Sequence, residues 1–327
     1  SNTVKIKSFT WAAIVAFSIA LPQATTAQDY PSKAITIIAP QKVGGAADLA
    51  ARSFAVVAEK YIGQSIRVVN NGGGAGVPGV MQAITSQPDG YTLLLTLAPH
   101  IVSVPLFQKD APFKADNLKY LSTLEDQPLV LAVSKSSSFN SFEEFISASQ
   151  VSAKALSVAV VSRTSLAALA FKALNLDIGA TGAQLSDIPF QSGPDQVRGL
   201  LAGDVDAALV NLTSISGALA SGDARILMVT STNRNSNFPD VPTAAELALT
   251  HVDGMTLWMG IAAPKDVPEA VILAWAEILP KVFSDPEYKR LLSRRGADLV
   301  GTGYDEANAF VVVQVDKMIK LKTAIGY

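Results

Sequence analysis

The chain contains no cysteine and only two histidines among its 327 residues. Without cysteine it can form neither a disulfide nor a lipid-modified N-terminal cysteine. His100 and His251 lie far apart in the sequence, so a zinc site built from histidine and cysteine is not expected. We therefore predict a protein without a metal site and without a cofactor.

Charge is also scarce in this sequence. Charged residues make up 17% of the chain, against about 25% in a typical globular protein, whereas 49% of the residues are hydrophobic. The 26 basic and 28 acidic residues leave a net charge of −2, and no basic stripe suggests a nucleic-acid partner. This composition favours a compact α/β protein that is long enough for two domains.

The N-terminal apolar run is too short for an ordinary membrane span. It covers residues 9–21, follows Lys5 and Lys7, and precedes small residues that suit cleavage. A transmembrane anchor is the alternative, but a spanning helix needs about 20 residues. We therefore interpret residues 1–27 as a secretory signal peptide and expect a periplasmic protein without a lipid anchor.

From residue 35 onward, short β-branched runs alternate with helical patterns. This alternation predicts two lobes, each a mostly parallel sheet flanked by helices. Two extended runs, residues 127–133 and 255–263, bracket the middle of the chain, and we interpret them as paired hinge strands. The first lobe then comprises residues 28–127 plus 256–327, and the second lobe comprises residues 128–255.

The most distinctive segment of the chain is residues 226–246. It reads as a strand, a loop whose path is set by two prolines, and a helix. Thr243 is the expected N-cap of that helix, and Glu246 three residues later completes a capping-box pattern.

Glycines and small residues follow the first predicted strand and open a helix. Backbone N–H groups at such a helix start, together with the helix dipole, suit a carboxylate ligand. The residues concerned are Gly44, Gly45, Ala46, Ala47 and Asp48. The alternative is a plain tight turn in which Asp48 caps the helix.

Polar loops occupy the corresponding places in the second lobe. Three hydroxyl groups and a guanidinium precede a predicted helix in Ser162, Arg163, Thr164 and Ser165, a set that suits anion binding. The alternative is a capped helix with an outward-facing Arg163. Two further strands end in neutral polar residues, namely Gln191, Ser192, Gly193 and Asn211.

Residues 74–79 satisfy the pattern G-x-G-x-x-G, which dinucleotide enzymes use to bind a pyrophosphate. Here the pattern follows the second strand instead of the first, and the next strand lacks an acidic residue for a ribose hydroxyl. Neither histidine lies near a nucleophile elbow, and no acidic cluster has metal spacing. A dinucleotide-dependent enzyme is therefore a minor alternative.

Many segments, taken in order, resemble the substrate receptors of tripartite tricarboxylate transporters, also called Bug-type solute-binding proteins. The resemblance spans residues 30–327. It is carried by residues 30–33, 40–48, 72–79, 88–94, 188–190, 200–206, 238–246, 260–264, 285–287 and 295–297.

The resemblance implies a two-lobed type II periplasmic binding-protein fold and no catalysis. It implies that the protein holds a small carboxylate in the cleft between its lobes and delivers it to a membrane permease. We expect it to act as a monomer; a sensory module that presents its ligand to a membrane signalling partner is the alternative. The ligand residues carried over are the loop residues named above together with Ala98, Pro99 and His100.

The sequence departs from the family pattern near this site. Ser165 occupies a position where the family usually has a histidine, and Asn71 and Gly72 replace an Arg-Pro pair. Lys42 and Arg163 add positive charge, which favours a dicarboxylate or a more acidic ligand.

Overall fold

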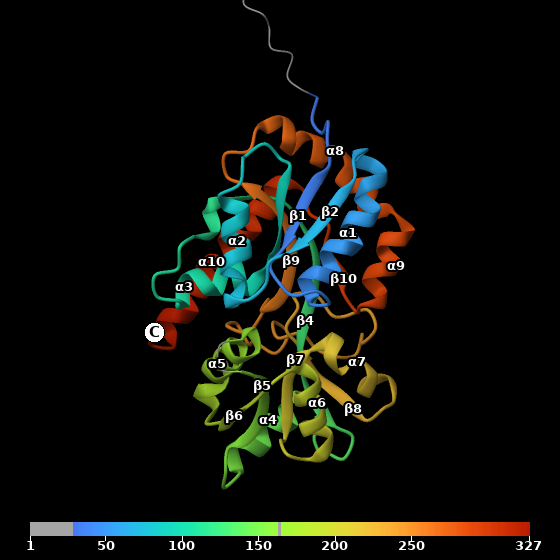
Figure 1. Cartoon of the computed structure of the whole chain (residues 1–327). Coiled ribbons are helices and arrows are strands. Elements are labelled where there is room, and N and C mark those ends of the chain that lie inside the picture. Colours follow the sequence, from blue (N-terminus) through green and yellow to red (C-terminus); the bar gives the residue numbers. More distant parts are fainter. Residues whose placement is uncertain (1–28, 163–164) are drawn as a thin grey trace, which may run out of the picture.

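The computed structural model describes residues 29–162 and 165–327, and the structural statements below concern those residues. They form two lobes, one above the other in Figure 1, with the long strand β4 (Leu118–Ser134) running from one lobe into the other. The predicted signal peptide, Arg163 and Thr164 lie outside the described residues.

The sheet of the first lobe has a parallel centre to which the hinge strands are added. Strand β1 pairs in parallel with both β2 and β3, β9 then pairs antiparallel with β3 and β4, and β10 pairs with β4. The bounds are β1 Ile35–Ala39, β2 Ile66–Asn70, β3 Thr92–Leu97, β9 Thr256–Pro264 and β10 Asp298–Leu299.

The sheet of the second lobe repeats this plan. Strand β5 pairs in parallel with β6 and β7, and β4 pairs antiparallel with β7 and β8. The bounds are β5 Leu156–Val161, β6 Leu185–Phe190, β7 Ala207–Asn211 and β8 Ala224–Val229.

Helices cover both sheets (Figure 1). On the first lobe they are α1 Ala46–Ile62, α2 Val77–Ile84, α3 Val104–Phe107, α8 Glu269–Ser284, α9 Pro286–Arg294 and α10 Tyr304–Ala324. On the second lobe they are α4 Phe142–Val151, α5 Leu166–Ile178, α6 Gly193–Ala202 and α7 Leu212–Ala220. Ser141 caps α4 as its sequence predicts, because its hydroxyl accepts a hydrogen bond from the Glu144 N–H at 3.1 Å.

The hinge lies where β4 changes its partner. Up to Pro128 it pairs with β9, and from Leu129 onward it pairs with β7. The predicted pairing of the two hinge strands is confirmed only at Gln127 and Pro128, which lie opposite Leu257 and Thr256. The rest of the predicted run pairs with β7 and β8, and β9 pairs mainly with residues 118–126. The change of partner falls at the proposed boundary between the lobes, which it supports. The buried Thr230 hydroxyl connects the two chain segments that pass between the lobes. It accepts a hydrogen bond from the Leu129 N–H of β4 at 3.1 Å and donates one to the carbonyl of Met255, just before β9, at 2.8 Å.

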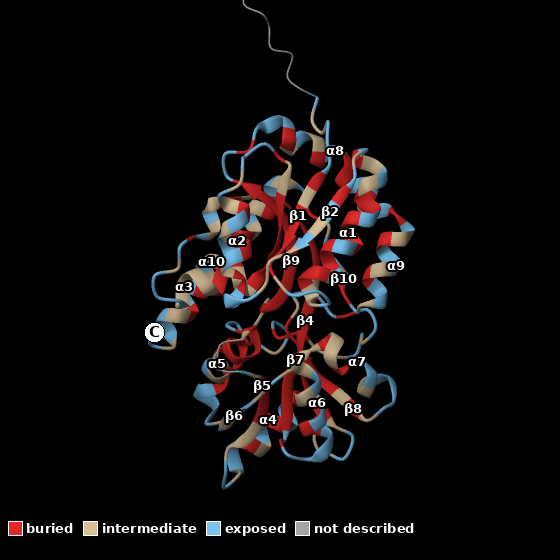
Figure 2. Ribbon diagram, viewed as in Figure 1, coloured by how far each residue is buried: buried red, intermediate tan, exposed pale blue. Residues whose placement is uncertain are grey.

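Each sheet is buried between its helices (Figure 2). In the first lobe, Phe54 of α1 packs against Trp275 of α8, with ring centroids 5.9 Å apart, and both side chains are fully buried. Trp258 on β9 is also a packing residue, because its ring meets Phe310 edge-on at 5.3 Å.

The helix expected after Thr243 does not form. Thr243 and Glu246 do make the reciprocal hydrogen bonds of a capping box, at 2.8 and 3.2 Å, but only turns follow. Thr243 forms an isolated parallel bridge with Val229, and Ala248 adopts a positive φ of 58° that ends the turn. The sequence-based prediction was wrong here because a cap pattern starts a helical turn without ensuring that the helix continues.

Within the described residues, no helix combines the length and the apolar character needed to cross a membrane.

Candidate functional site: the cleft between the lobes

A cavity of about 320 Å³ lies between the two lobes, and we call it the cleft. Its first-lobe wall consists of Gln41, Leu97, Pro99 and His100. The hinge strands contribute Leu129 and Leu257. The second-lobe wall consists of Val161, Ser165, Leu166, Ala167, Gly193, Gln196, Asn211 and Ser214.

Three helices of the second lobe begin at this cavity. Ser165 is the N-cap of α5, Gly193 is the first residue of α6, and Asn211 directly precedes α7. Each helix start carries unpaired N–H groups and a partial positive charge. A π-helical turn, Pro99–Ser103, begins on the opposite wall. The cleft is therefore suited to a negatively charged group even without a basic side chain.

Several polar side chains in the cleft are already engaged by the protein itself. Ser165 caps α5, since its hydroxyl accepts from the Ala168 N–H at 3.2 Å and donates to the Val161 carbonyl. The buried Gln196 amide donates to the carbonyls of Ala159 and Leu209, at 2.9 and 2.8 Å. These residues shape the wall instead of offering free donors.

Other polar side chains remain available to a ligand. Within the described residues, no hydrogen bond engages the side chains of Asn211 and Ser214 or the Nε2 amide of Gln41. Asn211 and Ser214 belong to the second lobe and Gln41 to the first. The free donors thus come from both walls of the cleft.

His100 belongs to the first-lobe wall and is neutral. Burial lowers the pKa of its imidazole to about 4, and its Nδ1 atom is buried without a partner in the described residues. The ring lies against Gly76, whose φ is +79°, and a Cβ at Gly76 would come within 2.2 Å of Nδ1. Glycine is therefore required at this position of the G-x-G-x-x-G pattern for packing on His100.

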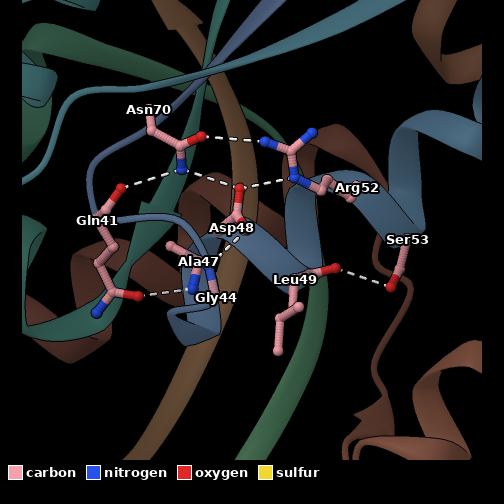
Figure 3. A network of polar contacts seen from close by, with 8 residues as sticks. All are labelled: Gln41, Gly44, Ala47, Asp48, Leu49, Arg52, Ser53 and Asn70. Carbon is pink, nitrogen blue, oxygen red and sulfur yellow. Dashed lines mark hydrogen bonds and ion pairs between the residues drawn. The ribbon is translucent and has the colours of Figure 1, made fainter.

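The loop that leads from β1 into α1 is held by a polar network (Figure 3). The Asp48 carboxylate accepts from the Gly44 N–H at 2.8 Å, from Asn70 Nδ2 at 2.9 Å and from Arg52 Nε at 2.8 Å. Burial raises the pKa of Asp48, but these hydrogen bonds outweigh it and hold the pKa below its usual value. Asp48 therefore holds the loop in place from within the first turn of α1, and the expectation that it caps the helix was wrong, because the N-cap is Gly45.

The same loop uses most of the N–H groups that the sequence offered to a carboxylate. The Gly45 N–H donates to the Lys42 carbonyl at 3.0 Å, and the Ala47 N–H donates to Gln41 Oε1 at 2.7 Å. Gly44, Gly45, Ala46, Ala47 and Asp48 are absent from the cleft lining, where Gln41 takes their place. The loop folds on itself because Gln41 and Asp48 satisfy its donors internally.

The other predicted ligand residues divide into two groups. Those that line the cleft are Pro99, His100, Ser165, Gly193 and Asn211. Those described elsewhere are Ala98, buried before the π-helical turn, Ser162, with a φ of 46°, Ser192, the N-cap of α6, and Gln191, at a separate surface depression. Arg163 and Thr164 lie outside the described residues, so their assignment to the site stays a prediction.

Gln41, Gln196 and Ser214 were not predicted from the sequence. Gln41 stands directly after Pro40 at the end of the first strand, which is a signal that could have pointed to it. Gln196 and Ser214 lie inside helices, three residues after the loops that were chosen. A residue at that distance faces back toward the helix start, so the loop assignments pointed to the right region.

No charged side chain lines the cleft among the described residues. Lys42, which was expected to add positive charge, is exposed and absent from the lining. The described residues also contain no group of three or more His, Asp or Glu side chains arranged to hold a metal ion.

Residues 50–327 match the model of a protein family described as the tripartite tricarboxylate transporter family receptor. The chain is 28% identical to protein BugT of Bordetella pertussis over 306 residues, which cover 93% of this chain and 92% of BugT. A TctC solute-binding protein from Polaromonas, 24% identical, has a similar structure with a TM-score of 0.79, covering 90% of this chain and 99% of that one.

A second solved structure is an R. palustris protein with adipate, 22% identical and with a TM-score of 0.73. It covers 91% of this chain and 99% of that chain. These likenesses show the two-lobed binding-protein fold, and the family consists of substrate-binding receptors, not enzymes. The chain belongs to the tripartite tricarboxylate transporter receptor family.

Proposed function

We propose that this protein is a periplasmic receptor that binds a small carboxylate in the cleft and delivers it to the permease of a tripartite tricarboxylate transporter. The observation that carries this proposal is the convergence of free donors from both lobes on one cavity: Gln41 from the first, Asn211 and Ser214 from the second. The adipate found with the R. palustris protein supports the ligand class.

The chemistry of the cleft fits a carboxylate held by neutral groups. Amide and hydroxyl donors and the N-terminal ends of α5, α6 and α7 favour a carboxylate without requiring an ion pair. Such a ligand touches both walls at once, so it stabilises the arrangement in which the lobes are close together. Ligand binding and hinge closure are therefore linked, with the hinge at β4 and β9.

A thermal-shift screen against mono-, di- and tricarboxylates tests the proposed ligand class. A ligand at 100 times its dissociation constant adds about 2.7 kcal/mol to the free energy of unfolding. For a chain of this size that corresponds to a rise in Tm of roughly 4 °C. If no carboxylate raises Tm while a different class of compound does, the proposed ligand class is wrong.

Export and delivery need a test in cells. We expect residues 1–27 to be removed on export and to contribute nothing to binding, so a chain starting at Gln28 should bind as the full chain does. Deleting either the receptor or the permease should abolish uptake of the ligand to the same extent. If uptake is unchanged while a signalling response is lost, the receptor serves sensing instead.

A further inference from the structure

A second cavity of about 440 Å³ adjoins the cleft, and we call it the side chamber. Pro99 and His100 line both cavities, so the two spaces meet at these residues. The side chamber lies between α3 of the first lobe and α5 of the second, near the C-terminal residue (Figure 1).

The wall of the side chamber is largely apolar. Val104 and Phe107 of α3 face it from one side, and the buried Leu169 of α5 faces it from the other. Its outer end is formed by Tyr327, whose ring meets Phe107 edge-on at 5.2 Å and lies 5.4 Å from the Lys172 ammonium. The chamber therefore offers hydrophobic and aromatic contacts to whatever occupies it.

Among the described residues, the boundary that the two cavities share is formed by Pro99 and His100 and carries no positive charge, whereas Lys172 lines the side chamber near Tyr327. His100 is neutral, because burial lowers the pKa of its imidazole. A second carboxylate placed here would lose its hydration without gaining a cation, which is strongly unfavourable. A hydrocarbon group placed here gains contacts on both sides.

We infer that the ligand is a monocarboxylate with an apolar body, its carboxylate in the cleft and its aromatic or medium-length aliphatic part in the side chamber. This inference rests on the proposed function and narrows it. Val104 and Phe107 are then specificity-determining residues, because they contact the apolar part and not the carboxylate.

Calorimetric titration with four sodium salts tests the inference on the full chain: acetate, hexanoate, 3-phenylpropanoate and adipate. Hexanoate and adipate have the same number of carbons and differ in the second carboxylate. We expect affinity to rise by about fourfold for each methylene buried, so hexanoate should bind at least tenfold more tightly than acetate. We also expect hexanoate and 3-phenylpropanoate to bind more tightly than adipate.

Two variants test whether the apolar part of the ligand lies in the side chamber. Val104→Phe fills the side chamber and should weaken hexanoate and 3-phenylpropanoate at least tenfold while leaving acetate unchanged. Phe107→Ala removes an aromatic wall and should weaken 3-phenylpropanoate several-fold. The matched control is Val313→Phe, because Val313 is 53% exposed on α10 and should leave all four affinities unchanged.

The possible results separate this inference from the function on which it rests. If no carboxylate binds to the unaltered chain, the proposed function fails. If adipate binds best and Val104→Phe has no effect, the function stands and the inference is overturned. If adipate binds best and Lys172→Gln weakens it, a second carboxylate reaches the far end of the side chamber, which also overturns the inference.

Discussion

At the scale of single residues, the Asp126 carboxyl at the hinge is buried in surroundings that disfavour its charged form. Burial, helped by the nearby Asp298 and Glu125, raises its pKa to about 6, although hydrogen bonds with Thr256 and the Gln127 backbone oppose this rise. Its Oδ1 atom is buried without a partner in the described residues. Glu125 is itself neutralised by a bidentate pair with Arg295, at 2.6 and 2.8 Å, whereas no cation among the described residues pairs with Asp126.

The direction of the Asp126 pKa shift sets a pH dependence. Because the pKa is higher in the folded protein than the ordinary 3.8, the folded state binds more protons between pH 3.8 and about 6. The contribution of this group to stability therefore falls as pH rises through that window and stays low above it. We predict that Asp126→Asn raises Tm by a few degrees at pH 7.5 and by less at pH 5. Equal changes at the two pH values, or a loss of stability, would count against this account.

Whether a polar side chain is free or engaged could not be predicted from its type. Asn211 and Ser165 were both chosen from the sequence and both line the cleft, yet Ser165 is occupied with capping α5 and Asn211 is not. The same applies to Asp48, whose partners Asn70 and Arg52 are brought together only by the folded sheet and helix. Site chemistry at this scale depends on tertiary contacts.

At the scale of elements, most strands and helices follow from local patterns. The β-branched run over residues 35–39 predicts a strand and forms β1. The local patterns also predict helices beginning at Leu166, Pro194 and Glu269, and α5, α6 and α8 begin within one residue of these positions. Helix α7 was missed because Leu212–Ala220 contains Ser, Thr and Gly, which favour helices weakly. The α3 segment was missed because Pro99 and Pro105 make the region look like a loop.

The turn after Thr243 contains backbone strain at Ala248, and a substitution can test it. Ala248 has a φ of 58°, a region that costs an L-residue about 1–2 kcal/mol but costs glycine little. We predict that Ala248→Gly increases the free energy of unfolding by up to about 1 kcal/mol, measured by urea denaturation. Ala245→Gly is the control, because Ala245 lies in the same turn without a positive φ and its replacement should be neutral or destabilising. If Ala248→Gly lowers the free energy of unfolding as much as Ala245→Gly does, the backbone at Ala248 is not strained.

At the scale of the whole molecule, the two extended runs around the middle section were sufficient to predict a hinge. The register was not predicted, because β4 pairs with β9 mainly through residues 118–126, which precede the predicted run. The side chamber could not be predicted in this way, because it depends on how α5 of one lobe packs against α3 and Tyr327 of the other. Contacts between lobes are specified by surfaces that are remote in sequence.

The central claim is that one ligand carboxylate is held by neutral donors from both lobes. The most direct measurement is calorimetric titration of a carboxylate identified in the thermal-shift screen against Gln41→Ala, from the first lobe, and Asn211→Ala, from the second. Asn233→Ala is the matched control, because Asn233 is an exposed amide that does not line the cleft.

Each cleft substitution removes a donor, so we predict an affinity loss of about 0.5–3 kcal/mol in both variants, the upper part of this range applying to bonds with a charged group. The Asn211 side chain makes no hydrogen bond within the described residues, so Asn211→Ala should lose affinity without losing thermal stability. The control should bind as the unaltered chain does. Unchanged affinity in both cleft variants would contradict the account, because the carboxylate would then lie outside the cleft.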